Sequence, residues 1–158
     1  MNQRVTNGKV VVFDFDGVVC ANNDGDYKNA PAYTFAIDQI NKTYDMGYKV
    51  ILCTARYGDR MNGCLARQYN AGFVEWMDWV KEQGVKFDEA WMGKPAGMLY
   101  VDDKACKVES SKGMEDWDNN FWPALKSLDN KDKYNQVVNE PELIKESEKL
   151  KELDPYVH

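Results

Sequence analysis

Two aspartates follow a buried-looking strand with a single residue between them. The segment "KVVVFDFDGVVC" begins at Lys9, and its apolar run ends at Asp14 and Asp16. Carboxylates at positions i and i+2 repel each other, which raises the pKa of one of them unless a counter-charge is present. A divalent cation removes this repulsion, and Mg²⁺ prefers oxygen ligands. Gly17 permits the close turn by which the chain leaves the strand.

Polar residues also follow two further apolar runs. Thr54 and Arg56 follow "YKVILC", and Asp102 and Asp103 follow "GMLYV". In parallel sheets, ligands collect at the carboxyl ends of the strands. We therefore expect these side chains to converge with Asp14 at one edge and to supply a hard-oxygen site for magnesium.

Such a set of groups suits phosphoryl transfer through a covalent intermediate. One aspartate attacks phosphorus, and the other protonates the leaving oxygen and then activates water. The hydroxyl of Thr54 and the ammonium of Lys94 bind the phosphoryl oxygens as their charge shifts, and the cation neutralises nucleophile and phosphate. Main-chain amides after Asp14, where Gly17 lies, and beyond Thr54, where Ala55 lies, are placed to cradle the phosphate.

Composition excludes several other chemistries. His158 is the only histidine among 158 residues, which argues against Ser-His-Asp, Cys-His and His-rich zinc sites. The net charge of -6 argues against a broad nucleic-acid surface. The sequence shows no apolar signal core, no membrane-spanning run and no CxxC pair, so we expect a cytoplasmic protein without membrane contact.

Strand-like and helix-like patterns alternate along the chain. Apolar runs predict strands, and apolar residues at helical spacing predict helices, at these positions: strands at 10–13, 49–53, 84–92 and 97–103, and helices at 31–47, 59–71 and 73–83. This order predicts an α/β fold, a three-layer sandwich around a mainly parallel, Rossmann-like sheet. After a loop at 109–120, a short helix or turn at 121–128 and an amphipathic helix at about 141–153 complete one predicted domain, residues 1–158.

Together, the motifs resemble those of the haloacid dehalogenase (HAD) superfamily of phosphohydrolases. The matching segments are "DFDGV" at 14–18, "ILCTAR" at 51–56, "GKP" at 93–95 and "LYVDDKA" at 99–105. The resemblance implies that Asp14 is the nucleophile and Asp16 the general acid and base. It also assigns the following roles: Thr54 as the second-motif hydroxyl, Lys94 as the third-motif lysine, Asp102 as a direct magnesium ligand and Asp103 as a ligand through water.

The sequence departs from the family pattern in two places. Position 18 is Val where many members have Thr. Lys94 lies only eight positions before Asp102, which leaves no room for the helix that many members place there, so Lys104 is the alternative active-site lysine. Neither the gap before Thr54 nor the gap after it can hold a folded cap, which predicts a small capless member.

These observations predict a magnesium-dependent phosphatase that hydrolyses a phosphate monoester of a small metabolite, a sugar phosphate or a nucleotide. The predicted metal ligands are Asp14, Asp16, Asp102 and Asp103, and the predicted substrate-binding residues are Gly17, Thr54, Ala55 and Arg56. An open site needs a large substrate, local loops or a partner subunit to exclude water, so a homo-oligomer is one possibility. Two alternatives stay open: a non-catalytic binding protein with the same fold, and a nucleic-acid end phosphatase.

Overall fold

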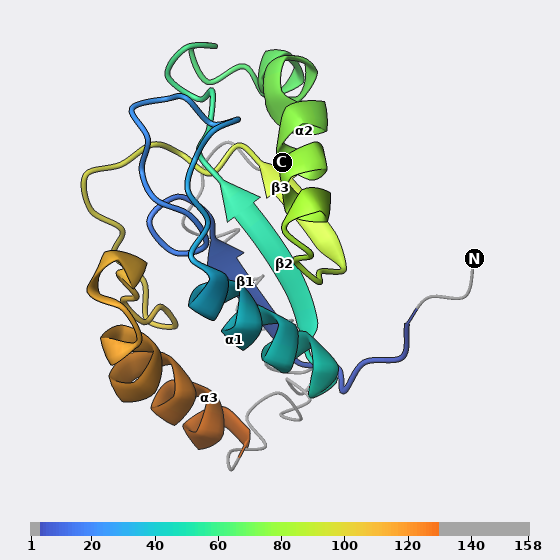
Figure 1. Ribbon diagram of the computed structural model, residues 1–158, viewed down its shortest axis with the longest axis vertical. Helices are drawn as coiled ribbons and strands as arrows, with labels where there is room; N and C mark the ends of the chain where they lie inside the picture. Colours follow the sequence, from blue (N-terminus) through green and yellow to red (C-terminus); the bar gives the residue numbers. More distant parts are fainter. Residues whose placement is uncertain (1–3, 130–158) are drawn as a thin grey trace, which may run out of the picture. The chain divides into compact units, whose positions relative to one another are not determined.

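The computed structural model describes residues 4–129 of the chain (Figure 1). Three strands form a parallel sheet in the order β1-β2-β3, with the following bounds: β1 Val10–Asp14, β2 Lys49–Thr54 and β3 Glu89–Met92. Two long helices connect them, α1 over Thr34–Asp45 and α2 over Leu65–Glu82. The predicted α/β fold with a parallel sheet is confirmed, and no cap domain is present among the described residues.

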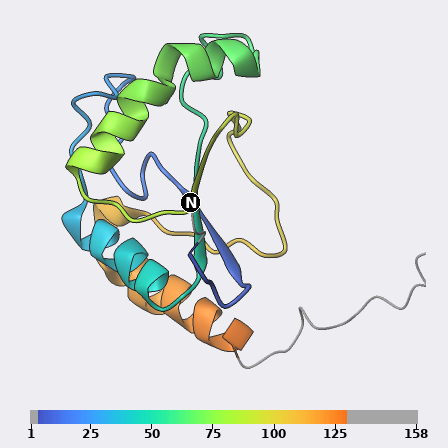
Figure 2. The same ribbon diagram turned by 90° about the vertical axis from the view of Figure 1, so that its right-hand side faces the viewer.

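The two faces of the sheet differ in how they are covered. Phe13 and Leu52 lie side by side in the register and are buried, whereas Val10, Val12 and Trp91 on the opposite face are 50%, 59% and 55% exposed. Figure 2 shows α1 and α2 on one side of the sheet and the loop after β3, drawn in yellow, on the other. Among residues 4–129, the helical layer over the second face of the predicted sandwich is therefore not seen.

Helix α2 is one continuous helix, whereas the sequence predicts two helices at 59–71 and 73–83; this prediction is wrong. Residues 59–63 form turns, and the helix runs unbroken through Gly72. A Cβ atom at Gly72 would lie 2.2 Å from Cε2 of Tyr57. The glycine is thus explained by the close approach of the Tyr57 ring and not by a helix end.

Residues 97–103 form no strand, in contrast to the prediction. Met98, Leu99 and Val101 are almost fully exposed, and the apolar run folds back on itself. The hydroxyl of Tyr100 donates to the carbonyl of Pro95 and accepts the N–H of Gly97 at 3.1 Å. These local hydrogen bonds hold the segment as a loop instead of a strand paired with β1.

After this loop come two short helical turns and a third helix, with these bounds: η1 Ser110–Lys112, η2 Trp117–Phe121 and α3 Trp122–Asp129. Trp117 is fully buried, and its ring packs against Phe13 and Phe121 with centroid distances of 6.1 Å and 5.1 Å. Trp117 therefore belongs to the core of the sheet.

The contacts divide the chain into two units, residues 1–123 and 124–158. The helix predicted at 141–153 lies outside the described residues, so the single domain of residues 1–158 stays a prediction. No helix within residues 4–129 is both long enough and apolar enough to cross a membrane.

Candidate active site

The candidate site begins with an ion pair at the carboxyl ends of the strands. Asp14 is the last residue of β1, and its Oδ2 lies 2.9 Å from Nζ of Lys94. The backbone N–H of Lys94 donates to the carbonyl of Thr54 at 3.2 Å, which places the residue directly beyond β3 and beside β2. Lys104 is exposed, and its backbone N–H donates to Asp102. The structure therefore brings Lys94 to Asp14, despite its short spacing from the fourth motif.

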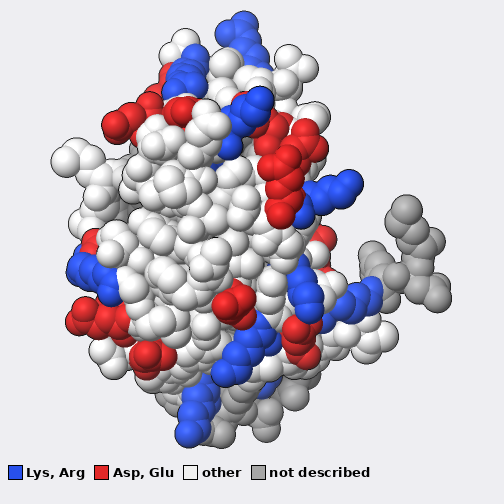
Figure 3. Space-filling model, viewed as in Figure 1, with Lys and Arg blue, Asp and Glu red and all other residues white. Residues whose placement is uncertain are grey.

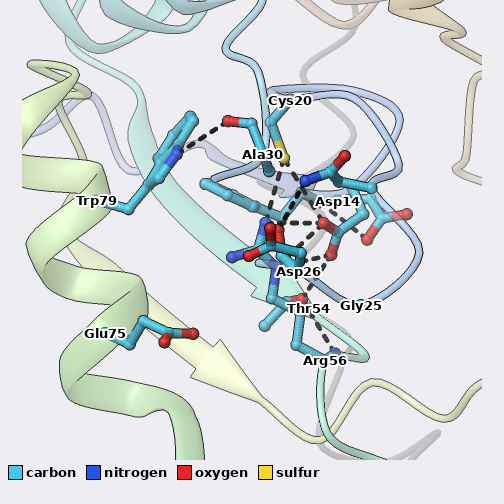
Figure 4. Close-up of polar contacts among 12 residues, drawn as sticks. Asp14, Cys20, Gly25, Asp26, Ala30, Thr54, Arg56, Glu75 and Trp79 are labelled. Atoms are coloured by element: carbon cyan, nitrogen blue, oxygen red, sulfur yellow. Dashed lines mark hydrogen bonds and ion pairs between the residues drawn. The ribbon is translucent and has the colours of Figure 1, made fainter. Parts of the chain in front are cut away.

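The second aspartate is held by Arg56. Asp16 accepts three hydrogen bonds from the guanidinium, at 3.0 Å and 2.9 Å from Nε and 2.8 Å from Nη2. The Thr54 hydroxyl also donates to Asp16 at 3.3 Å and accepts the backbone N–H of Arg56 at 3.1 Å. Figure 4 shows Thr54 and Arg56 within a cluster of polar contacts near Asp14 and Cys20. Asp16 is thus fixed from β2 by two residues of the predicted site.

Arg56 is buried, with only 2% of the residue exposed. Its guanidinium carbon lies 4.8 Å from the ring centroid of Phe15 and 4.6 Å from that of Tyr27. Burial lowers the pKa of Arg56, but the hydrogen bonds and charge of Asp16 outweigh this effect and leave the pKa raised. In the structure, the Arg56 side chain binds Asp16. Substrate binding by Arg56 stays a prediction.

Cys20 completes this buried cluster. Its Sγ accepts a hydrogen bond from Nη2 of Arg56 at 3.2 Å and lies 3.5 Å from Oδ1 of Asp16. Burial and the neighbouring Asp16 raise the pKa of the Cys20 thiol to about 12. The thiol is therefore neutral and packs as a core side chain.

The loop after Asp14 has the tight form that the sequence predicts. Gly17 has a φ of 85°, a left-handed conformation that glycine adopts without strain. Its N–H donates to the carbonyl of Cys20 at 2.7 Å, so this amide is already used within the loop. The N–H of Phe15 donates to Oδ1 of Asp14 at 2.9 Å. Of the two predicted phosphate-cradling positions, Ala55 is the one that lines an open cavity.

The predicted magnesium ligands are not gathered in one place. Asp102 and Asp103 are exposed in the loop after β3, and among residues 4–129 no three His, Cys, Asp or Glu side chains are close enough to hold a metal ion. Asp14 and Asp16 are instead neutralised by Lys94 and Arg56. In this arrangement the donor set does not fit a divalent cation.

Two cavities lie beside these residues. One, of about 260 Å³, is lined by Tyr27, Ala55, Tyr57 and Arg60, among others. The other, of about 530 Å³, extends from the loop after β2 to Lys94. Three non-glycine residues near them have positive φ values: Asp24 at 48°, Tyr57 at 62° and Asn62 at 50°. Residues with a strained backbone are often found at ligand-binding sites in proteins. These loops are therefore candidates for substrate contact.

Gln68, which lines the larger cavity, is not among the site residues predicted from the sequence. A signal for it exists in the sequence. The buried residues of α2 include Gln68, Gly72, Trp76 and Trp79, which recur at helical spacing, and Gln68 is the one polar side chain on that stripe. A polar residue on a buried stripe requires a partner or a function.

Comparison with known proteins supports the fold. No protein-family model matches the chain, and no curated protein matches it significantly. A crystal structure of a structural genomics target from Vibrio cholerae is 27% identical with a TM-score of 0.60, covering 66% of this chain and 85% of that one. A D,D-heptose 1,7-bisphosphate phosphatase from B. bronchiseptica, complexed with magnesium and phosphate, is 24% identical with a TM-score of 0.38, covering 62% and 54%.

The element order, the parallel sheet and the likeness to the Vibrio cholerae structure place the chain among α/β proteins with a parallel sheet flanked by helices. The α/β fold predicted from the sequence is thereby confirmed.

Proposed function

We propose that the protein is a phosphatase that hydrolyses the phosphate monoester of a small metabolite through phosphorylated Asp14. The observation that carries this proposal is the pairing of Asp14 with Lys94 at 2.9 Å at the carboxyl end of the parallel sheet, where Asp14 ends β1, Asp16 follows it and Lys94 lies just beyond β3. A carboxylate nucleophile, a cation for the phosphoryl oxygens and a second carboxyl group for proton transfer are the groups that this reaction needs.

In the first step, an Asp14 oxygen attacks phosphorus, and the bond between phosphorus and the leaving oxygen breaks. The ammonium of Lys94, which is paired with Asp14 in the free protein, also binds the phosphoryl oxygens. Its positive charge lowers the electrostatic repulsion between the carboxylate nucleophile and the phosphate. Asp16 gives a proton to the leaving oxygen. In the second step, Asp16 takes a proton from water, which attacks phosphorus, releases phosphate and restores Asp14.

Proton transfer by Asp16 requires a change in its hydrogen bonds. Both carboxylate oxygens of Asp16 accept hydrogen bonds from the Arg56 guanidinium, so this pairing must loosen before an Asp16 oxygen can face the leaving group or a water molecule. The Thr54 hydroxyl, which donates to Asp16, is free to turn toward a phosphoryl oxygen at the same moment. Thr54 and Arg56 thus position Asp16 in the resting site.

Magnesium belongs to this proposal on the strength of the sequence motifs. The proposed ligands are Asp14, Asp16, Asp102 and Asp103, of which the last two lie in the loop after β3. No chemical step above depends on the cation, because the donor set is not assembled in the described arrangement. When bound, magnesium would supply further positive charge to the phosphate.

The direct test is Asp14→Asn. We expect phosphate release from p-nitrophenyl phosphate and from a panel of metabolite phosphates to fall by about 10³-fold or more, because the covalent route is lost. Asp38→Asn, an exposed aspartate on α1, is the matched control and should keep wild-type activity. Activity that persists in Asp14→Asn would refute the mechanism.

The non-catalytic alternative has one observation in its favour: cations of the chain itself already neutralise both carboxylates. A protein that binds orthophosphate but hydrolyses no member of the panel would support it. The nucleic-acid alternative is tested with 3′- and 5′-phosphorylated oligonucleotides. Figure 3 shows acidic and basic side chains interspersed on the viewed face, without a continuous basic strip for a phosphate backbone.

A further inference from the structure

Gln68 is a buried side chain whose carbonyl oxygen has no partner within the described part of the chain. Only 2% of the residue is exposed, and no hydrogen-bond donor from residues 4–129 reaches Oε1. Buried polar atoms of this kind are uncommon and are usually paired with protein, water or ligand. The unpaired oxygen is therefore able to accept a hydrogen bond from a ligand.

The position of Gln68 makes a ligand the natural donor. The residue lies in the first turns of α2 and lines the cavity of about 530 Å³. Gly93 and Lys94 line the same cavity, and Nζ of Lys94 is paired with Asp14. Lys94 thus connects the cavity to Asp14, so a phosphate ester bound at Lys94 has room for the rest of its molecule beside Gln68.

The lining of this cavity indicates the kind of group it takes. Besides Gln68, its polar side chains are Asp59 and Asn62, and its apolar ones include Leu65 and Pro95. Lys94 is the only cationic residue among those that line it. Carboxylate and amide oxygens accept hydrogen bonds from hydroxyl groups, whereas a second phosphate or carboxylate would find no further positive charge here.

We propose that this cavity is the subsite for the leaving group, that it takes a polyhydroxylated alcohol, and that Gln68 accepts a hydrogen bond from one of its hydroxyls. The inference rests on the proposed phosphatase function and adds the chemical class of the substrate. The backbone supports the subsite, because a Cβ at Gly93 would lie 2.1 Å from Cδ2 of Leu65. Glycine at this position leaves room for the Leu65 side chain at the cavity wall.

The experiment compares substrates that differ in their hydroxyl groups. Glycerol 3-phosphate and n-propyl phosphate share a three-carbon skeleton, and ribose 5-phosphate is a larger hydroxylated probe. For the wild-type protein we expect kcat/KM for both hydroxylated substrates to exceed that for n-propyl phosphate by about 10-fold or more, since a site built for a hydroxyl rejects an analogue that lacks it. In Gln68→Leu this ratio should fall to about 1, with n-propyl phosphate hydrolysis within about 2-fold of wild type.

Two further variants separate binding from folding. Gln68→Met preserves the length of the side chain without its carbonyl and should show the same loss of preference as Gln68→Leu. Gln83→Leu makes the same change at an exposed position at the end of α2 and should leave the ratio unchanged. Circular dichroism and thermal unfolding of each variant confirm that the fold is retained.

Equal loss on hydroxylated and alkyl substrates, or no loss in either variant, would overturn the role of Gln68 while leaving the phosphatase function intact. If the wild-type protein hydrolyses no phosphate monoester, the proposed function fails, and the subsite fails with it.

Discussion

At the scale of single residues, the pair formed by Asp16 and Arg56 sets the state of the candidate site. The two side chains are 24% and 1% exposed, so their interaction is only weakly screened by water. Removing one partner of a buried ion pair leaves an uncompensated charge. We therefore expect the pair to serve the stability of the fold as well as the orientation of Asp16, the proposed proton donor.

The variant Arg56→Met tests this double role. We expect the free energy of unfolding to fall by about 3 kcal/mol, because Asp16 loses its buried partner. Urea unfolding followed by tryptophan fluorescence measures the change. Arg60→Met is the matched control: Arg60 is exposed and should cost about 1 kcal/mol or less. Equal losses in the two variants would show that the buried pair is not special.

The sequence predicts the types of these residues better than their partners. Asp14, Asp16, Thr54 and Lys94 stand out because each follows a short apolar run and carries a group suited to phosphoryl transfer. That Arg56 would bind Asp16 could not be foreseen, since the two positions are 40 residues apart and a charged residue after a strand suits substrate equally well.

At the scale of elements, helix α2 accommodates the strained turn that precedes it. Tyr57 has a φ of 62°, unfavourable for a bulky residue, and its ring occupies the space above Gly72. The hydroxyl of Tyr57 donates to Glu75 at 3.0 Å, which ties the turn to the helix. The helix and the turn therefore depend on each other.

For helix α2 we predict that a Gly→Ala substitution lowers the free energy of unfolding, opposite to its usual effect in a helix. In most helices Gly→Ala stabilises by up to about 1 kcal/mol, but Gly72→Ala should destabilise the protein, because the new methyl group collides with Tyr57. Chemical denaturation measures the sign. Ala71→Gly, at an exposed position of the same helix, should show only the ordinary loss of about 1 kcal/mol. In a Tyr57→Gly background, Gly72→Ala should become stabilising; failure to do so would exclude the steric explanation.

The elements also show where periodicity misleads. The apolar runs at 10–13 and 49–53 become β1 and β2 because each finds a parallel neighbour. The run at 98–101 is equally apolar, yet Tyr100 closes it into a loop through hydrogen bonds within a few residues. Strand pairing is non-local, so apolar composition alone does not decide which run enters a sheet.

At the scale of the whole molecule, one face of the sheet is not covered by any helix within residues 4–129. Within residues 4–129, β1 pairs only with β2, and Val10 and Val12 stand exposed on the face opposite α1 and α2. The α/β class was predictable from alternating patterns. Which segment covers this face was not, because an amphipathic pattern predicts a helix without assigning it to one face of a sheet.

Magnesium binding through the predicted ligands would require a change at this level. Asp102 and Asp103 would have to leave their exposed loop and reach Asp14, so we expect the amides of residues 98–103 to exchange hydrogen more slowly when Mg²⁺ and orthophosphate are added. Mass spectrometry of the exchange reports the segment directly. Asp14→Asn should abolish the effect. Magnesium binding without any change in residues 98–103 would assign the cation to other ligands.

Cys20 has a practical consequence for following the site. With its pKa raised to about 12 and its side chain buried, the thiol presents almost no thiolate to an alkylating reagent at neutral pH. Cys64 and Cys106 are exposed and Cys53 is partly exposed, so these three free thiols react before Cys20 and can be blocked. Any slow labelling that follows at Cys20 requires its sulfur to part from Arg56 and Asp16. The rate of alkylation of Cys20 then reports how often its contacts with Arg56 and Asp16 open in the absence of substrate.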